Sequence, residues 1–418
     1  MNAGTGGRRV LLAAAFIRAS ATGMAGVLLG IYLAKLGLAP GAVGLIAGAG
    51  LAGATAGALA VTLRGRLWEL RRALLVLGLL ATVGGALLAV VSHPVALAAA
   101  AFLGMVNGMG RDRGPATVLE QALIPATTTA AGRTTAFAWY TALQDVGHAL
   151  GSLAAGLPAL LAAMLPVDEK GSFRLAIGLY AALVGASALL YLWLPPTSRE
   201  GTSATQGTIS PRSRRVLTRI SLLFALDGLG GGFLVTALLS YFFFERFGVG
   251  ATTVGVLFFA GRMANVVSHF GAAWLARRIG LVNTMFWTHV PSSLLLVTVA
   301  FTPSFWVATI LFLLREALVE MDVPTRQSYV MAVVRPEERT AASGVTNLVR
   351  LGSWAIGPAL AGWMMGGLAL AAPLVAGAAL KVTYDLLLFF SFRRLRPPEE
   401  RGAEQEGDTT FATEGGSR

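Results

Sequence analysis

The chain is a succession of long apolar blocks separated by short polar connections. Each block runs for about 20 residues or more, without the polar alternation of a surface helix or strand. About 20 apolar residues in a helix cross the roughly 30 Å hydrocarbon core of a bilayer. The pattern therefore predicts an all-α membrane protein of twelve transmembrane spans, numbered here in chain order, near residues 9–35, 41–63, 73–92, 94–124, 134–164, 173–194, 216–244, 251–275, 282–301, 304–334, 341–366 and 369–392.

Arginines gather on alternate connections between these blocks, and short cytoplasmic loops of membrane proteins carry such an excess of Lys and Arg. The opposite connections carry few basic residues near the helix ends, such as Lys35 and Arg246. An even number of spans places both termini on the same side. We therefore expect an inner-membrane protein with both termini in the cytoplasm. A role in topology and in the cytoplasmic gate is predicted for Arg64, Arg66, Arg71, Arg72, Arg277 and Arg278.

A polar stretch rich in Ser, Gly and Pro divides the chain into two halves of six spans. We predict a first bundle at 1–194, a cytoplasmic linker at 195–215, a second bundle at 216–396 and a disordered cytoplasmic tail at 397–418. The halves repeat one another: Arg18 aligns with Asp227 in spans 1 and 7, and Pro115 answers a proline in span 10. Span 5 matches span 11 over a run of shared Arg, Thr and Gly positions. Such duplication is typical of secondary transporters.

Composition supports a membrane protein and narrows the function. The chain is 55% hydrophobic and 13% charged, whereas soluble domains carry roughly 25% charged residues. The net charge of +12 is spread between the spans, so no nucleic-acid partner is expected. Cysteine is absent, and the polar residues form no catalytic or zinc motif, so we expect no enzyme, no cofactor and no metal. A site that combines His148, His269 and Asp145 lacks the spacing of a ligand motif.

Several motifs resemble those of the major facilitator superfamily. The loop Leu275–Gly280 reads LARRIG, similar to the family's Leu-Ala-Asp-Arg-x-Gly, with Arg277 where the aspartate belongs. Pro336–Gly344 resembles the family's entry to span 11. Leu103–Pro115 is similar to the arginine-bearing span 4 of drug/proton antiporters, and Gly352–Gly362 to an antiporter motif. The resemblance implies two pseudo-symmetric six-helix bundles, with spans 1, 4, 7 and 10 lining a central cavity.

Charged side chains concentrate in those four spans, where each costs at least about 2.5–3.5 kcal/mol unless it faces a protein interior or a water-filled cavity. Arginine suits carboxylate and phosphate groups, so the cavity is expected to bind an ionic or zwitterionic solute. An ion pair between Arg18 and Asp227 that fixes the two halves is one alternative, and solvated arginines at the end of span 4 are another. Lys381 and Asp385 are read as a structural pair one helical turn apart. The predicted substrate-binding residues are Arg18, Arg111, Arg113, Asp227, Asp322 and Arg326.

Span 10 supplies the predicted proton site. Glu316 and Glu320 lie one turn apart on a helix, and two nearby carboxylates in a poorly hydrated cavity resist double ionisation. Such a pair can hold one shared proton, unless Arg111 or Arg113 neutralises it in a static salt bridge.

The leading functional hypothesis is a secondary transporter of a small organic solute, coupled to a proton or another ion. The antiporter-like motifs favour efflux. Uptake of an anionic metabolite and lipid flipping by the same fold are the alternatives. The expected partners are a small-molecule substrate, the coupling ion and membrane lipid, and a monomer is expected.

Overall fold

The computed structural model describes residues 3–64, 69–129, 132–195, 211–321 and 339–392. The first half contains α1 (Ala3–Lys35), α2 (Pro40–Arg64), α3 (Leu70–Val90), α4 (Pro94–Gly104), α5 (Pro115–Leu123), α6 (Arg133–Ala154), α7 (Leu157–Met164) and α8 (Glu169–Leu190). Short 3-10 turns, η1 (Ile124–Thr127) and η2 (Tyr191–Trp193), follow α5 and α8. The second half contains α9 (Pro211–Phe233), α10 (Thr236–Phe247), α11 (Ala251–Ile279), α12 (Leu281–Phe301), α13 (Phe305–Val319), α15 (Arg339–Gly367) and α16 (Ala372–Phe392).

Each of the twelve predicted spans contains at least one described helix. Within the described residues, eight helices are long and apolar enough to cross a membrane, and a ninth span results if the bent pair α6 and α7 is counted as one. The predicted all-α membrane fold is confirmed. Linker residues 196–210 and the tail from 393 lie outside the described residues, so the predicted boundaries of the linker and tail stay predictions.

Besides the bend between α6 and α7, the described residues show breaks within spans 4 and 7. Span 4 unwinds over residues 105–114, between α4 and α5. Met105 and Gly110 there have φ angles of 50° and 65°, which helices do not use. Glycines lower helix propensity in this stretch, and Pro115 restarts the helix at its first turn. Span 7 breaks between α9 and α10, where Val235 is extended.

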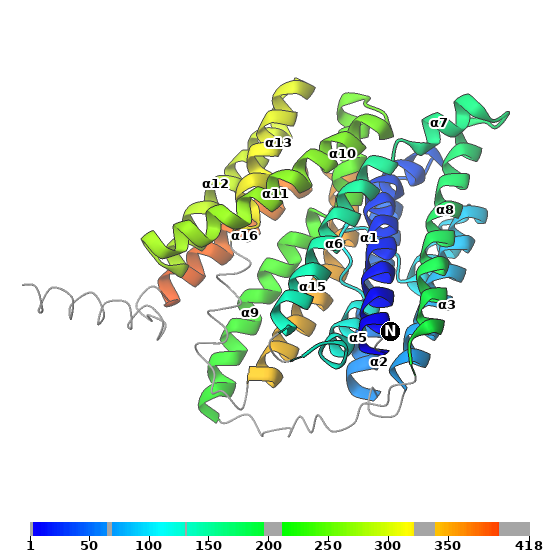
Figure 1. The fold of residues 1–418 in the computed structure, drawn as a ribbon. Helices are drawn as coiled ribbons and strands as arrows, with labels where there is room; N and C mark the ends of the chain where they lie inside the picture. Colours follow the sequence, from blue (N-terminus) through cyan, green and yellow to red (C-terminus); the bar gives the residue numbers. More distant parts are fainter. Residues whose placement is uncertain (1–2, 65–68, 130–131, 196–210, 322–338, 393–418) are drawn as a thin grey trace, which may run out of the picture.

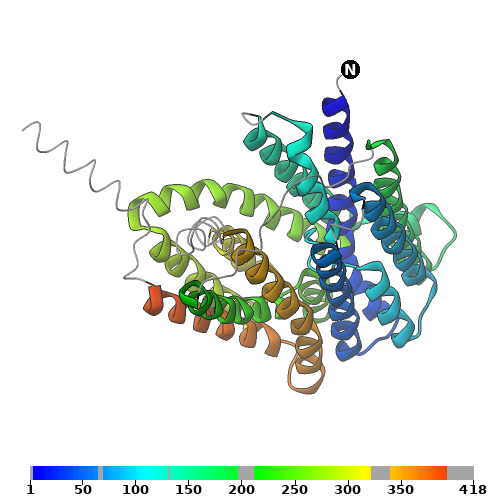
Figure 2. The same cartoon turned by 90° about the horizontal axis from the view of Figure 1, so that it is seen from below.

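The helices of each half pack mainly on one another. In the first half α1 contacts α6 and α8, and in the second half α9 contacts α15 and α16. The halves meet where α2 contacts α15, α6 contacts α11 and α1 contacts α10. Figure 1 shows α1, α6 and α15 near the middle, and Figure 2 shows the two groups of helices side by side from below.

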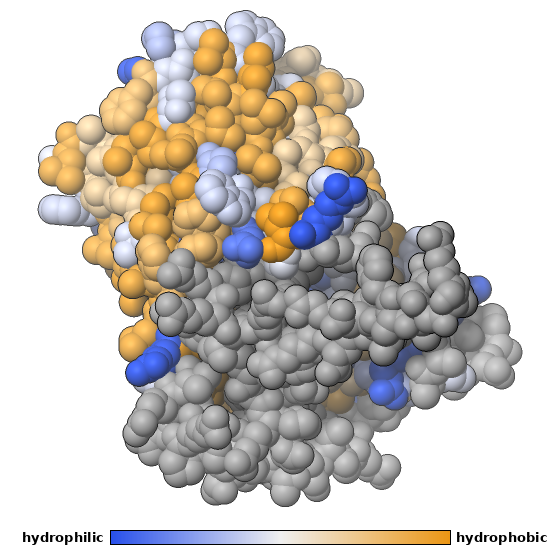
Figure 3. All heavy atoms as spheres, turned by 90° about the vertical axis from the view of Figure 1, so that its left-hand side faces the viewer, coloured by the Kyte–Doolittle hydropathy of each residue, from blue (hydrophilic) through white to orange (hydrophobic). Residues whose placement is uncertain are grey.

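Large apolar side chains cover the outer surfaces. On the face that carries α12 and α13, apolar residues form a broad patch (Figure 3). Trp287 and Phe301 of α12 and Trp306 of α13 are each more than 60% exposed. A water-soluble monomer rarely exposes so large an apolar area, whereas a lipid-facing surface requires it.

Glycines bring the halves into backbone contact at the end of the molecule where α1 finishes and α2 begins. We call this the upper end, as drawn in Figure 1, and the opposite end the lower end. A Cβ added to Gly44 of α2 would lie 2.8 Å from the Cα of Gly362 in α15, and would also strike the carbonyl of Pro358. Gly30 of α1 approaches the carbonyl of Ala237 in α10 in the same way. The upper end is therefore closed by contacts that only residues without a side chain permit.

Replacing Gly44 by valine should force the upper ends of the two halves apart, because the new side chain overlaps the backbone of α15. Spin labels on cysteines introduced at the exposed residues Leu165 and Phe301, on opposite halves of the upper end, measure the separation. The chain has no native cysteine to interfere. We expect a shift to longer distances for Gly44→Val. Gly178→Val is the control, since a Cβ there meets nothing within 4 Å. Equal distance distributions in the two variants would contradict this account of the closure.

Candidate functional site

The unwound segment 105–114 of span 4 lies against the second half of the molecule. Three of its carbonyl groups, those of Gly108, Met109 and Gly110, accept hydrogen bonds from α10 and α11. The donors are the Ala237 amide to Gly108 O at 2.9 Å, the Thr236 hydroxyl to Met109 O at 2.6 Å and the Arg262 guanidinium to Gly110 O at 3.1 Å. Ala237 is in the first turn of α10, where amide groups lack helical acceptors. The two broken spans therefore satisfy each other's backbone.

Arg111 extends this contact with its side chain. Its guanidinium lies 2.9 Å from a carboxylate oxygen of Glu320 and also donates to the amide oxygen of Asn265. Asn265 in turn donates to the carboxylate of Glu316 at 2.9 Å, and Arg315 pairs with the same carboxylate. Glu316 and Glu320 therefore have separate arginine partners. The salt bridge between Arg111 and Glu320, which was the alternative, is present between the halves. The proton-coupling role of Glu316 and Glu320 stays a prediction.

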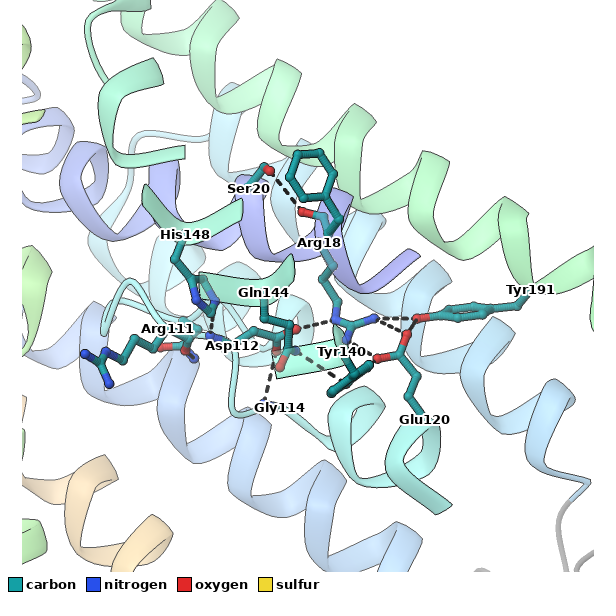
Figure 4. A network of polar contacts seen from close by, with 12 residues as sticks. Arg18, Ser20, Arg111, Asp112, Gly114, Glu120, Tyr140, Gln144, His148 and Tyr191 are labelled. Carbon is teal, nitrogen blue, oxygen red and sulfur yellow. Dashed lines mark hydrogen bonds and ion pairs between the residues drawn. The ribbon is translucent and has the colours of Figure 1, made fainter. Parts of the chain in front are cut away.

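A buried polar cluster lies within the first half, and we name it the first-half cluster: Arg18, Asp112, Glu120, Tyr140 and Tyr191 (Figure 4). Arg18 of α1 is 8% exposed and binds two carboxylates. Its Nε lies 2.5 Å from Asp112, and its terminal nitrogens lie 2.5 and 2.9 Å from the two oxygens of Glu120. The hydroxyls of Tyr140 and Tyr191 donate to the same Glu120 carboxylate at 2.8 and 2.7 Å.

A second buried cluster has the opposite balance of charge. Asp227 of α9 is 1% exposed and lies 3.1 Å from Lys381 of α16 and 3.2 Å from Arg350 of α15. These three residues are named the second-half cluster. The alternative of an ion pair between Arg18 and Asp227 does not hold in this structure, because Arg18 binds Asp112 and Glu120 while Asp227 binds Lys381 and Arg350. The expected pair of Lys381 with Asp385 is replaced as well, since Asp385 lies 3.0 Å from His289 of α12.

Arg113 and Arg350 come from opposite halves and lie over the same aromatic ring. Their guanidinium carbons are 4.6 and 4.4 Å from the ring centroid of Trp354. Trp354 is 4% exposed, so the ring is held rigidly in α15. The contact places two cations at the boundary between the halves, where a negatively charged group can reach both.

One cavity lies between the halves, and it is bordered by the second-half cluster together with Arg111, Arg113 and Trp354. Its described charged lining has six basic and three acidic residues. They are Arg111, Arg113, Arg262, Arg315, Arg350 and Lys381, with Asp227, Glu316 and Glu320. The side chains of Arg111 and Glu320 are each 18% exposed, and that of Arg350 is 19% exposed, so the cavity keeps them in contact with water.

The other residues expected at the site divide into two groups. Asp322, Arg326 and Arg66 lie outside the described residues, as do the side chains of Arg64 and Arg277. Arg72 pairs with Glu69 at 2.8 Å, and Arg278 lies 4.7 Å over Trp274 of its own helix. Arg71 is described as well, and the role of all these arginines in gating stays a prediction. Among the described residues, no group of three or more His, Asp or Glu could hold a metal ion.

Sequence reasoning missed several members of the site. Tyr140 and Tyr191 lie in apolar spans, and nothing in the local pattern marks them as partners of a glutamate. Lys381 was noted but given the wrong partner, because spacing along one helix says nothing about neighbouring helices. Arg350 and Trp354 share a helical face at i and i+4 and were detectable by that spacing.

Comparison with known proteins agrees with this architecture. The family model described as Major Facilitator Superfamily matches residues 11–358. The chain belongs to the major facilitator superfamily. It is therefore an integral membrane protein and a member of a transporter family, as the sequence predicted.

The individual relatives are distant. An uncharacterized membrane protein of Saccharomyces cerevisiae is 23% identical over 418 residues, which cover 92% of this chain and 93% of that protein. The nucleoside transporter NupG matches with a TM-score of 0.70 and 14% identity, over 94% of this chain and 99% of its own. A D-xylose–proton symporter matches with a TM-score of 0.69 and 13% identity, over 91% and 95%. These likenesses establish the fold.

Replacing Glu120 by glutamine should destabilise the protein, because it breaks a buried ion pair and removes acceptor oxygens from the buried donors of Arg18, Tyr140 and Tyr191. The expected loss is about 3 kcal/mol, seen as a lower apparent melting temperature in detergent. Glu69→Gln is the matched control. It removes a similar pair whose arginine side chain is 82% exposed, and such surface pairs contribute about 0–1 kcal/mol. Equal melting temperatures for the two variants would contradict a structural role for Glu120.

Proposed function

We propose that this member of the superfamily is an ion-coupled carrier of a small organic anion, which binds in the cavity between the halves. The observation that carries the proposal is the excess of basic side chains among the described lining residues. Charged groups in a poorly hydrated cavity are costly, and an excess of one sign favours a solute of the other sign. A carboxylate or phosphate supplies that charge.

The second-half cluster is the proposed anion site. Lys381 and Arg350 share the carboxylate of Asp227, so their two positive charges face one negative charge. Arg113 reaches the same region from the first half, over the ring of Trp354. An anion in this place contacts both halves, which favours the closed arrangement of the halves around it. Guanidinium groups suit this task because their planar donors match the two oxygens of a carboxylate.

Topology and direction are part of the proposal. With both termini in the cytoplasm, the upper end faces the outside, and its glycine contacts close the cavity to that side. Antiporter-like stretches in spans 4 and 11 support export, and the symporter among the structural neighbours supports a proton as the coupling ion.

Proteoliposomes with an imposed pH gradient test direction and substrate together. A panel of carboxylates and phosphates is loaded on one side, and accumulation on the other side is measured. Export predicts that anions accumulate on the side that corresponds to the outside, at the expense of the proton gradient. Accumulation in the opposite sense would replace export by uptake. Transfer of a fluorescent phospholipid between leaflets, without movement of any soluble anion, would replace the anion carrier by a flippase.

Replacing Lys381 by methionine should weaken binding of the transported anion about tenfold or more, since a lost charge-assisted hydrogen bond corresponds to about 1.4 kcal/mol or more. The measurement is the concentration for half-maximal transport. Lys35→Met is the matched control, because Lys35 lies at the upper end, 2.8 Å from Glu169 and away from the cavity lining. An unchanged half-maximal concentration in Lys381→Met would remove the second-half cluster from the binding site.

A further inference from the structure

In the first-half cluster, the single guanidinium of Arg18 forms ion pairs with two carboxylates, those of Asp112 and Glu120. Arg18, Asp112 and Tyr191 also line a second cavity, which lies inside the first half. Figure 4 shows the two carboxylates on different sides of the Arg18 side chain. The two acids are equivalent in charge and differ sharply in their surroundings, and this difference separates their roles.

Glu120 is the more extensively hydrogen-bonded of the two carboxylates. Its side chain is 0% exposed. Its two oxygens accept four hydrogen bonds, two from Arg18 and one each from Tyr140 and Tyr191. A proton on Glu120 would displace one of these donors, and hydrogen bonds to the charged form stabilise that form.

Asp112 has fewer donors. One oxygen lies 2.5 Å from Arg18 Nε, and the other accepts from the Gly114 amide at 3.3 Å, close to the limit of a hydrogen bond. Its side chain is 6% exposed and borders the inner cavity, next to the polar side chains of Thr22 and Ser187. A proton can therefore reach Asp112 and add to its weakly bonded oxygen without breaking the contact of the other oxygen.

The charged and titratable groups around Asp112 come from several elements. Arg18 is on α1, and Glu120 is on α5. On α6, the ring of His148 accepts the backbone amide of Asp112 at 2.7 Å, which fixes that ring nitrogen as unprotonated. The remaining groups are Arg111 and Arg113 beside it in the chain, Tyr140 and Asp145 on α6, Tyr180 on α8, Tyr191 on η2 and Arg262 on α11.

We infer that Asp112 is the residue that binds and releases the coupling proton, with Arg18 and Glu120 as a fixed ion pair beside it. The inference rests on the proposed ion coupling and moves the proton site from span 10 to the unwound part of span 4. A proton that enters through the inner cavity bonds to a carboxylate oxygen of Asp112, and its later departure restores the carboxylate. Arg18 keeps Glu120 as its partner in both states.

The position of Asp112 explains how such a proton acts on the whole molecule. Asp112 follows Arg111, which binds Glu320 and Asn265 of the second half. The same segment accepts the backbone and side-chain donors of α10 and α11. Protonation weakens the ion pair between Arg18 of the first half and Asp112 of this segment, while the hydrogen bonds from the second half to the segment remain. The proton therefore changes the free energy of separating the two halves.

The decisive variant is Asp112→Asn, reconstituted in proteoliposomes. Asparagine has the shape of a protonated aspartate and cannot titrate, so gradient-driven accumulation should be lost while substrate counterflow continues. Asp168→Asn is the matched control. Asp168 caps the exposed start of α8, and asparagine caps a helix equally well, so this variant should keep both activities. Asp112→Glu, which restores a titrating group, should regain part of the gradient-driven accumulation.

The Glu316→Gln/Glu320→Gln double variant tests the competing site in span 10. Gradient-driven accumulation that survives in Asp112→Asn and fails in this double variant would overturn the inference. Loss of both activities in Asp112→Asn, without recovery in Asp112→Glu, would also overturn it.

A readout without substrate separates this inference from the proposed anion transport. Spin labels at Leu165 and Phe301 report the separation of the halves between about pH 5 and pH 9. The wild-type distance distribution should shift with pH, that of Asp168→Asn should shift likewise, and that of Asp112→Asn should stay constant. This result stands even if no organic anion is transported. A wild-type distribution that does not depend on pH, or an unchanged pH response in Asp112→Asn, would overturn the proton site.

Discussion

The structure depends on one constraint, that backbone interrupted inside a membrane protein must find hydrogen-bond partners other than water. Residues 105–114 leave the helix, and their carbonyl groups accept from Ala237, Thr236 and Arg262 of the other half. Within the first half, the ring of His148 accepts a hydrogen bond from the amide of Asp112, and the side-chain oxygen of Asn107 accepts one from the amide of Met109. The segment therefore belongs to both halves at once. Any movement of one half against the other has to break or exchange these hydrogen bonds, which makes this segment the natural point of control.

The predicted repeat gives the halves equivalent positions, and Arg18 and Asp227 at one such position have opposite charges. Arg18 and Asp227 align in the repeat. Arg18 binds two carboxylates, whereas Asp227 binds two cations. A buried group of three charges is never neutral, so each cluster favours a ligand or an ion of the missing sign. The first-half cluster has a surplus negative charge, which suits a proton, and the second-half cluster has a surplus positive charge, which suits an anion. This division of work follows from the pairing within each half, and a direct pair between Arg18 and Asp227 would have cancelled both.

The fold was predictable because the apolar blocks are long and the positive residues alternate between the loops, and both signals are local in the chain. The site was predictable in part. Charges inside the spans were visible, and Arg18, Arg111 and Asp227 were named from them. Their partners were not predictable, since Lys381 and Arg350 reach Asp227 from other helices. Tyr140 and Tyr191 lie in apolar stretches of sequence, yet in the structure their hydroxyls donate hydrogen bonds to Glu120. Span 4 contains glycines, but membrane helices tolerate glycine, so the sequence did not distinguish a continuous helix from a break.

The two clusters have no residue in common, so a proton in one and an anion in the other can influence each other only through structure that contacts both. The unwound segment meets this requirement: Arg111 binds Glu320 of the second half, Asp112 belongs to the first-half cluster, and Arg113 lies over Trp354 beside Arg350. Three consecutive residues thus connect the proton site, the contact between the halves and the anion site. Coupling between two sites in proteins is typically about 1–3 kcal/mol, and a hydrogen bond to a charged group contributes about 1.5–3 kcal/mol. Weakening of the single contact between Arg18 and Asp112 is therefore large enough to couple proton binding to anion movement.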